Sequence, residues 1–188
     1  MVCKSCGLTG HNSATCGKKP IAVAPAPAAG PKASEMVPLD VWEDMGILIE
    51  KVNEVAKGLM KGRAESVYQT ALTMELQDMG VRYTSEETIP VVYKGMTVGF
   101  ERMDLCLMSW FKVIIELKAI ASDIKPDNHF QVLNYMRYKD YKYGAVVNFC
   151  QGSGKPVQVV YVMRDDERVW LIDWENDTIQ RLVDYEFE

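Results

Sequence analysis

Three cysteines and one histidine lie within the first sixteen residues, in the pattern Cys3-x2-Cys6-x4-His11-x4-Cys16. Three thiolates and one imidazole are the tetrahedral ligand set of a closed structural zinc site. A peptide this short has no hydrophobic core, so zinc binding would supply the free energy of its folding. The spacing therefore predicts one structural Zn²⁺ bound by these four side chains. A cysteine-rich tail without metal is the alternative.

Two acidic residues, Asp104 and Glu116, are predicted to face each other across a β-hairpin. If residues 109–111 form a three-residue loop, position i lies opposite position 220 − i, which pairs Asp104 with Glu116. Lys118 projects on the same face, because side chains alternate along a strand. Two such close carboxylates repel each other unless a cation lies between them, and Mg²⁺ or Mn²⁺ suits oxygen ligands. A solvent-facing hairpin with an ordinary Lys–Glu ion pair is the alternative.

A third carboxylate, Glu65, is predicted to point inward from a helix. It shares helical spacing with Tyr68, Leu72, Leu76 and Met79, so it lies on an otherwise apolar face. A carboxylate in that position is costly unless it is paired or bound to a metal. The alternative is that Glu65 lies at the edge of the apolar stripe and reaches solvent.

The elements that must position these residues follow from the hydrophobic patterning. We expect a first helix from near residue 41, capped by Asp40, and a second helix from residue 63 to Gly80. A third helix over 127–140 carries Gln131, which could orient a water or contact a phosphate. Strands are expected over 81–88, 89–93, 97–108, 112–119, 144–150, 157–164 and 168–174, with a tight turn at 94–96. This order predicts an α+β (α/β) fold, with a mixed β-sheet flanked by helices.

The composition divides the 188 residues into a basic arm and an acidic body. Residues 1–34 hold four lysines and no acidic residue, whereas residues 35–188 hold 17 Lys/Arg and 26 Asp/Glu. Residues 18–39 are rich in proline and alanine, which predicts a linker between residues 1–17 and a domain over 40–188. No apolar run suggests a membrane span or a secretory signal, so we expect an intracellular protein, in the cytoplasm or nucleus, that is not secreted. The acidic body argues against tight duplex binding by the domain alone.

The N-terminal cluster resembles the CCHC zinc knuckle of retroviral type, C-x2-C-x4-H-x4-C, at all four ligand positions. The resemblance implies binding of single-stranded RNA or DNA, with Lys4, Lys18 and Lys19 contacting phosphates. Such knuckles often carry an aromatic stacking residue, and here Leu8 is the only apolar candidate, so we expect weak affinity from the knuckle alone. A knuckle that binds another protein is the alternative.

The body carries a series of short motifs in a characteristic order. They are Gly62-Arg-Ala-Glu65-Ser-Val-Tyr68, Tyr93-Lys94-Gly95, Arg102-x-Asp104, Glu116-Leu-Lys118, Gln131-x3-Tyr135 and Gly144-Ala-Val-Val-Asn148-Phe149. Together they resemble the GxxExxY protein family of the PD-(D/E)XK nuclease-like superfamily, over roughly residues 41–150. Met103 stands where the proline that names the superfamily would be.

The resemblance implies a restriction-endonuclease-like core with a catalytic set of Glu65, Asp104, Glu116, Lys118 and Gln131. It also implies that Asp104 and Glu116 bind one or two Mg²⁺ or Mn²⁺ ions and that Lys118 orients or deprotonates the attacking water. The implied function is a metal-dependent nuclease directed to nucleic acid by the knuckle. Dimers are common in this superfamily, so the resemblance also makes a homodimer a candidate assembly. A catalytically inactive nucleic-acid-binding protein and a zinc-dependent protein-interaction module are the alternatives.

Overall fold

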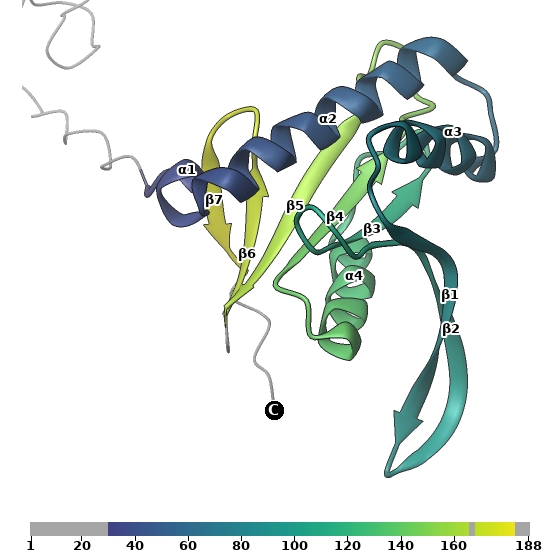
Figure 1. Ribbon diagram of the computed structural model, residues 1–188, viewed down its shortest axis with the longest axis vertical. Coiled ribbons are helices and arrows are strands. Elements are labelled where there is room, and N and C mark those ends of the chain that lie inside the picture. The colour runs from purple at the N-terminus through teal and green to yellow at the C-terminus, as the bar shows by residue number, and fades with distance from the viewer. Residues whose placement is uncertain (1–29, 166–167, 183–188) are drawn as a thin grey trace, which may run out of the picture. The chain divides into compact units, whose positions relative to one another are not determined.

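The computed structural model describes residues 30–165 and 168–182 (Figure 1). The helices in this part of the chain are α1 (Ala33–Met36), α2 (Leu39–Leu59), α3 (Glu65–Asp78) and α4 (Pro126–Lys139). The strands are β1 (Tyr83–Tyr93), β2 (Met96–Leu107), β3 (Val113–Lys118), β4 (Tyr143–Asn148), β5 (Gln158–Asp165), β6 (Arg168–Asp173) and β7 (Thr178–Arg181). None of these helices has the length and apolar composition that crossing a membrane requires.

The strands form one mixed sheet in which they lie side by side in chain order, from β1 to β7. All neighbours are antiparallel except β3 and β4, which are parallel and are joined by α4. A parallel pair needs such a crossover connection, because a tight turn can join only antiparallel strands. The predicted mixed sheet flanked by helices is confirmed: α2 and α3 cover one face and α4 covers the other (Figure 1).

Alternation along the central strands divides the core into two layers. Leu105, Ile115 and Leu117 belong to the layer under α2 and α3. Cys106 and Ile114 belong to the layer under α4, which also contains Val132, Leu133 and Met136 of that helix. One face of these strands is therefore buried against α2 and α3, and the other against α4. Cys106 and Cys150 are buried free thiols, as their apolar surroundings predict.

The strands β1 and β2 form a long two-stranded ribbon that extends beyond the rest of the sheet (Figure 1). The two segments predicted over 81–88 and 89–93 are one continuous strand. The predicted tight turn is present, with φ of +48° at Lys94 and +78° at Gly95. Positive φ at both positions of a two-residue hairpin loop is typical of a type I′ turn, whose twist matches that of the strands.

The structure corrects three expectations at the ends of the domain. The first helix begins at Leu39 and its N-cap residue is Pro38, so Asp40 lies in the first turn and does not cap it. The strand β7 was not predicted. Helix α1 lies within the segment predicted as a linker, and Ala33 is fully buried. Ser34 joins α1 to the turn before β7, because its backbone N–H and its hydroxyl both donate to the Asp177 carboxylate.

Candidate active site

Asp104 and Glu116 lie where β2 and β3 stop pairing. Leu107 pairs with Val113 and Leu105 with Ile115, so the two positions add to 220 as predicted. The loop spans residues 108–112 and is five residues long, where three were expected. Because the strands end one residue earlier on both sides, the register is unchanged. Continued by one residue, this register places Asp104 opposite Glu116.

Asp104 is held by backbone and helix contacts. Its Oδ2 accepts a hydrogen bond of 2.7 Å from the backbone N–H of Leu117. Its backbone carbonyl accepts one of 3.2 Å from Gln69 Nε2 on α3, which also donates to Glu86. Glu86 in turn pairs with Arg102 at 2.6 Å. The position of Asp104 is therefore coupled to α3 through Gln69, which was not among the predicted site residues. Gln69 lies four residues after Glu65, and this helical spacing could have indicated it.

Glu116 is a buried carboxylate with one unsatisfied oxygen. The residue is 2% exposed, and its Oε1 accepts a hydrogen bond from Lys118. Its Oε2 is buried and has no hydrogen-bond partner. Burial, together with the nearby charge of Asp104, raises the pKa of Glu116 from 4.5 to about 7. The solvent-facing Lys–Glu pair considered above is thus wrong, because this pair lies inside the domain.

Glu65 begins α3 and is half-buried, at the end of a face on which Tyr68, Leu72 and Leu76 are buried. Its carboxylate accepts a hydrogen bond from the backbone N–H of Ala119. Burial raises the pKa of Glu65, and the charge of Lys118 opposes that rise. Glu65 therefore lies near the end of β3.

The motif G-x-x-E-x-x-Y has a structural explanation in the turn before α3. Gly62 has φ of +90°, which a residue with a side chain rarely adopts. The Tyr68 hydroxyl donates a hydrogen bond of 2.6 Å to the backbone carbonyl of Met60. Gln151 connects both ends of the motif, since it accepts a hydrogen bond from the Gly62 N–H and donates one to the Tyr68 hydroxyl. The glycine and the tyrosine thus hold the turn from which Glu65 enters the helix.

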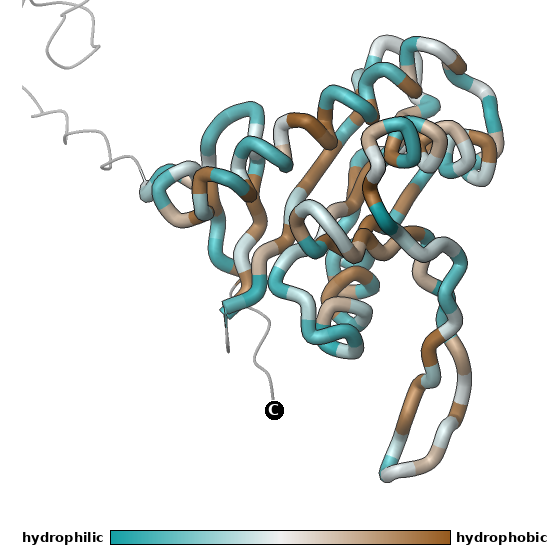
Figure 2. Tube along the Cα trace, viewed as in Figure 1, coloured by the Kyte–Doolittle hydropathy of each residue, from teal (hydrophilic) through white to brown (hydrophobic). Residues whose placement is uncertain are grey.

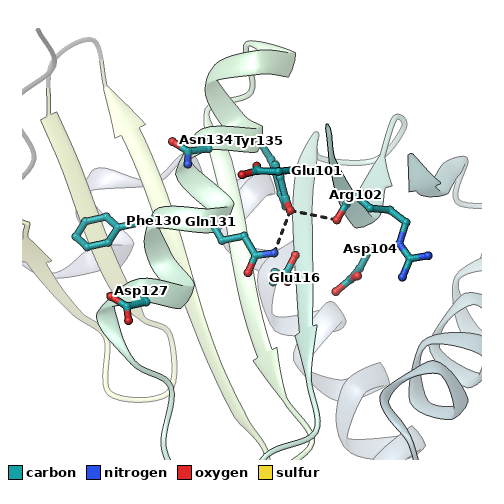
Figure 3. Close-up of a pocket in the computed structure, with 9 residues that line it drawn as sticks. All are labelled: Glu101, Arg102, Asp104, Glu116, Asp127, Phe130, Gln131, Asn134 and Tyr135. Carbon is teal, nitrogen blue, oxygen red and sulfur yellow. Dashed lines mark hydrogen bonds between the residues drawn. The ribbon is translucent and has the colours of Figure 1, made fainter. Parts of the chain in front are cut away.

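An open pocket of about 620 Å³ lies beside the two acids (Figure 3). It is lined by Glu101, Arg102, Asp104, Glu116, Asp127, Phe130, Gln131, Asn134 and Tyr135. Gln131 extends toward Glu116 and donates to the Tyr135 hydroxyl at 3.0 Å, and this hydroxyl donates to the Arg102 carbonyl at 3.1 Å. The pocket thus brings Gln131 together with Asp104 and Glu116. Lys118 and Glu65 are not among its lining residues.

The model of the PD-(D/E)XK nuclease superfamily matches residues 43–160. The chain belongs to this superfamily. Its mixed sheet with flanking helices is consistent with the restriction-endonuclease-like core, and all five predicted catalytic positions lie inside the matched region. Neither the curated proteins nor the solved structures give a match.

Nucleases of the PD-(D/E)XK superfamily generally use divalent metals, and the acidic pair has the chemistry to hold one. Asp104 and Glu116 offer oxygen donors, of which Glu116 Oε2 is buried and has no partner. The raised pKa of each carboxyl indicates that its negative charge is poorly compensated by the protein alone. Among the described residues, no three His, Cys, Asp or Glu side chains form a ready-made metal-binding group. Glu65 therefore does not join the pair in a single cluster.

The predicted zinc knuckle lies outside the described residues. This applies to Cys3, Cys6, His11 and Cys16, and to the predicted phosphate contacts Lys4, Lys18 and Lys19. Zinc binding, and the contribution of this segment to nucleic-acid binding, stay predictions.

Proposed function

We propose that this superfamily member hydrolyses phosphodiester bonds of nucleic acid with Mg²⁺ or Mn²⁺ bound by Asp104 and Glu116. The observation that carries the proposal is the buried, unpartnered Oε2 of Glu116 beside a second buried carboxylate. Burying a carboxylate is unfavourable where one of its oxygens has no partner, even though Lys118 contacts the other oxygen. The high pKa of Glu116 reflects this cost, which a divalent cation would offset.

The residues around the pair have separate roles in this proposal. When bound, the cation would stabilise the negative charge that develops on the phosphate as the ester bond breaks. The Leu117 N–H fixes one oxygen of Asp104, so its other oxygen is available to the cation. Lys118, held against Glu116, would orient the attacking water, and Glu65 would support that water from the start of α3. Gln131 would contact the phosphate from the pocket.

A degradation assay on the full-length chain tests the proposal. Single- and double-stranded DNA and RNA are incubated with Mg²⁺, with Mn²⁺ or without divalent ions, using the wild type, Asp104→Asn and Lys118→Met. We expect cleavage only with a divalent ion, and a loss on the order of 100-fold or more in both variants. Glu54→Gln, which removes an exposed carboxylate paired with Lys51 on α2, is the control and should cleave normally.

Two results would contradict the nuclease proposal. One is cleavage that persists in Asp104→Asn or without divalent ions, which would indicate a contaminant. The other is equal and negligible activity in all the proteins on all the substrates, which would favour a catalytically inactive nucleic-acid-binding protein.

We also propose that residues 1–17 bind one Zn²⁺ and direct the domain to single-stranded nucleic acid. The charge distribution supports this proposal. The lysines of residues 1–34 can attract phosphates, whereas the net negative charge of residues 35–188 repels them. A linked binding module raises the effective concentration of its substrate at the active site. Zinc content near one ion per chain, and weaker RNA or DNA binding in Cys6→Ser, are the expected results. Zinc content near zero, or unchanged binding in Cys6→Ser, would rule out this role.

A further inference from the structure

The distal part of the β1–β2 ribbon, residues 88–100, exposes an unusual amount of apolar surface. We call these residues the arm. Its exposed large side chains are Val91, Val92, Tyr93, Met96, Val98 and Phe100, and Phe100 is 71% exposed. Figure 2 shows apolar positions along the ribbon where it extends away from the sheet. Clustered exposed apolar side chains on a soluble domain mark an interaction site.

The charge of the arm differs from that of the body. The arm contains no Asp or Glu, and Lys94 at its tip is its only charged residue, although the whole chain carries a net charge of −5. Lys94 Nζ lies 5.3 Å from the centre of the Tyr93 ring. A cation and an exposed aromatic ring are thus held together at the tip.

The arm is continuous with the candidate active site. A groove of about 300 Å³ lies between β1 and α4, with Ile89, Pro90 and Val91 on one side and Arg137 and Tyr138 on the other. Two further lining residues, Glu101 and Asn134, also line the pocket beside Asp104 and Glu116. A molecule bound in that pocket can therefore extend along the groove toward the arm.

Three aromatic side chains of the described residues are more than half exposed, two on the arm and one lining the groove. They are Tyr93 and Phe100 on the arm and Tyr138 on α4, which are 61%, 71% and 52% exposed. Tyr138 lines the groove directly, and Phe100 pairs across the ribbon with Pro90, which also lines it. Exposed aromatic rings beside a cation form a surface on which unpaired bases stack without sequence preference.

We propose that the arm and the groove bind an unpaired segment of the nucleic-acid substrate, with bases stacked on Tyr93, Phe100 and Tyr138. Lys94 would contact the phosphate next to the base on Tyr93. Bases within a duplex stack on one another, so this surface selects single strands or locally opened duplexes. The identity of the substrate rests on the proposed nuclease function, whereas the stacking surface rests on the arm itself.

A second copy of the chain is a less suitable occupant of the arm. β1 is the edge strand of the sheet, and pairing with another β1 would need its backbone donors. Pro90 has no N–H, and the register shifts between Val91 and Val92. Both features disfavour edge-to-edge pairing.

Binding of fluorescent oligonucleotides by the full-length chain tests the inference. All proteins carry Glu116→Gln, so that the oligonucleotides stay intact in Mg²⁺. We expect Tyr93→Ala and Phe100→Ala each to weaken single-strand binding by about 5- to 100-fold, and to leave blunt duplex binding unchanged. Tyr93→Phe, which keeps the ring, should bind normally. Val92→Ala and Val98→Ala, which remove exposed aliphatic groups from the same arm, should also bind normally.

Several results would overturn the inference. Unchanged single-strand binding in Tyr93→Ala and Phe100→Ala would do so. An equal loss in Val98→Ala would also do so, since valine has no aromatic ring for stacking. An equal loss of duplex binding would also contradict it. Sedimentation provides a further test: a wild-type dimer that Phe100→Ala converts to a monomer, with oligonucleotide binding unchanged, would assign the arm to a second copy.

The nuclease proposal and the stacking inference fail in different ways. If Tyr93→Ala and Phe100→Ala bind single strands normally while the Glu116-containing protein cleaves with Mg²⁺, only the stacking inference fails. If these variants lose single-strand binding while the Glu116-containing protein cleaves nothing, only the nuclease proposal fails.

Discussion

The backbone N–H of Leu117 donates a 2.7 Å hydrogen bond to the side chain of Asp104, where β2 and β3 stop pairing. The Asp104 carboxylate thus takes the place that a backbone carbonyl of β2 would occupy in a longer ladder. This bond fixes the rotamer of the acid relative to β3, the strand that carries Glu116 and Lys118. The end of β2–β3 pairing therefore sets how the Asp104 carboxylate is placed relative to Glu116 and Lys118.

The stability of the domain should depend on the charge of Glu116. Its pKa is about 7 in the folded chain and near 4.5 when unfolded, so the folded state binds more protons between these pH values. The free energy of unfolding should therefore fall as pH rises from about 4.5 to 7, by roughly 3 kcal/mol from this group. Asp104 and Glu65, whose pKa values are also raised, act in the same direction.

Glu116→Gln should reduce this pH dependence of the free energy of unfolding, measured by urea unfolding without divalent ions. The exposed control Glu54→Gln should keep it, and an unchanged slope in Glu116→Gln would contradict the assignment.

Lys118 should influence hydrolysis and metal binding in opposite directions. Its amino group contacts Glu116 Oε1, so it competes with a cation for that carboxylate. Lys118→Met should therefore bind Mg²⁺ at least as tightly as the wild type, measured by calorimetry or as a rise in melting temperature at pH 8. Asp104→Asn should lose most of this binding, because it removes a ligand. Equal loss of Mg²⁺ binding in both variants would mean that Lys118 only supports the fold.

Gln69 should act by positioning Asp104. Gln69→Ala removes its hydrogen bonds to the Asp104 carbonyl and to Glu86, and should lower the free energy of unfolding by about 1 kcal/mol. We expect hydrolysis to fall on the order of 10-fold at saturating Mg²⁺, because Asp104 shifts. Gln77→Ala, on the same helix, removes a comparable bond to the Tyr83 hydroxyl and is the control. If both variants lose activity equally, Gln69 has no special role.

Tyr135 should connect α4 to β2 at the wall of the pocket. Burial raises the pKa of its hydroxyl to about 12, so it stays protonated and donates to the Arg102 carbonyl at any working pH. Tyr135→Phe should cost about 1–2 kcal/mol in urea unfolding and release Gln131, which donates to the same oxygen. Tyr138→Phe, three residues further along and exposed, should unfold like the wild type. Equal stability of Tyr135→Phe and wild type would show that this bond contributes nothing.

The site was predictable where it depends on local pattern. Strand alternation alone sends Asp104, Glu116 and Lys118 to one face, and the distance between the two strand segments sets the register. Helix α1 and strand β7 escaped prediction because four residues are too few to show a periodic pattern. Glu101, Asn134 and Gln69 escaped for another reason. Their places in the pocket and around Asp104 depend on how α3, α4 and the ribbon pack together, and no local spacing encodes that packing.

By itself, the sequence determined which acids share a face of the hairpin, since side-chain direction follows from the period of the strand. Only the tertiary structure decided whether that face meets water. Helix α4 covers the layer that contains Cys106 and Ile114, and the Glu116 carboxylate becomes buried at its edge with one oxygen unpartnered. The same packing leaves the arm uncovered, because the sheet and helices end before the ribbon does. Burial depends on which element covers a surface, so it is a property of the assembled domain and not of any one segment.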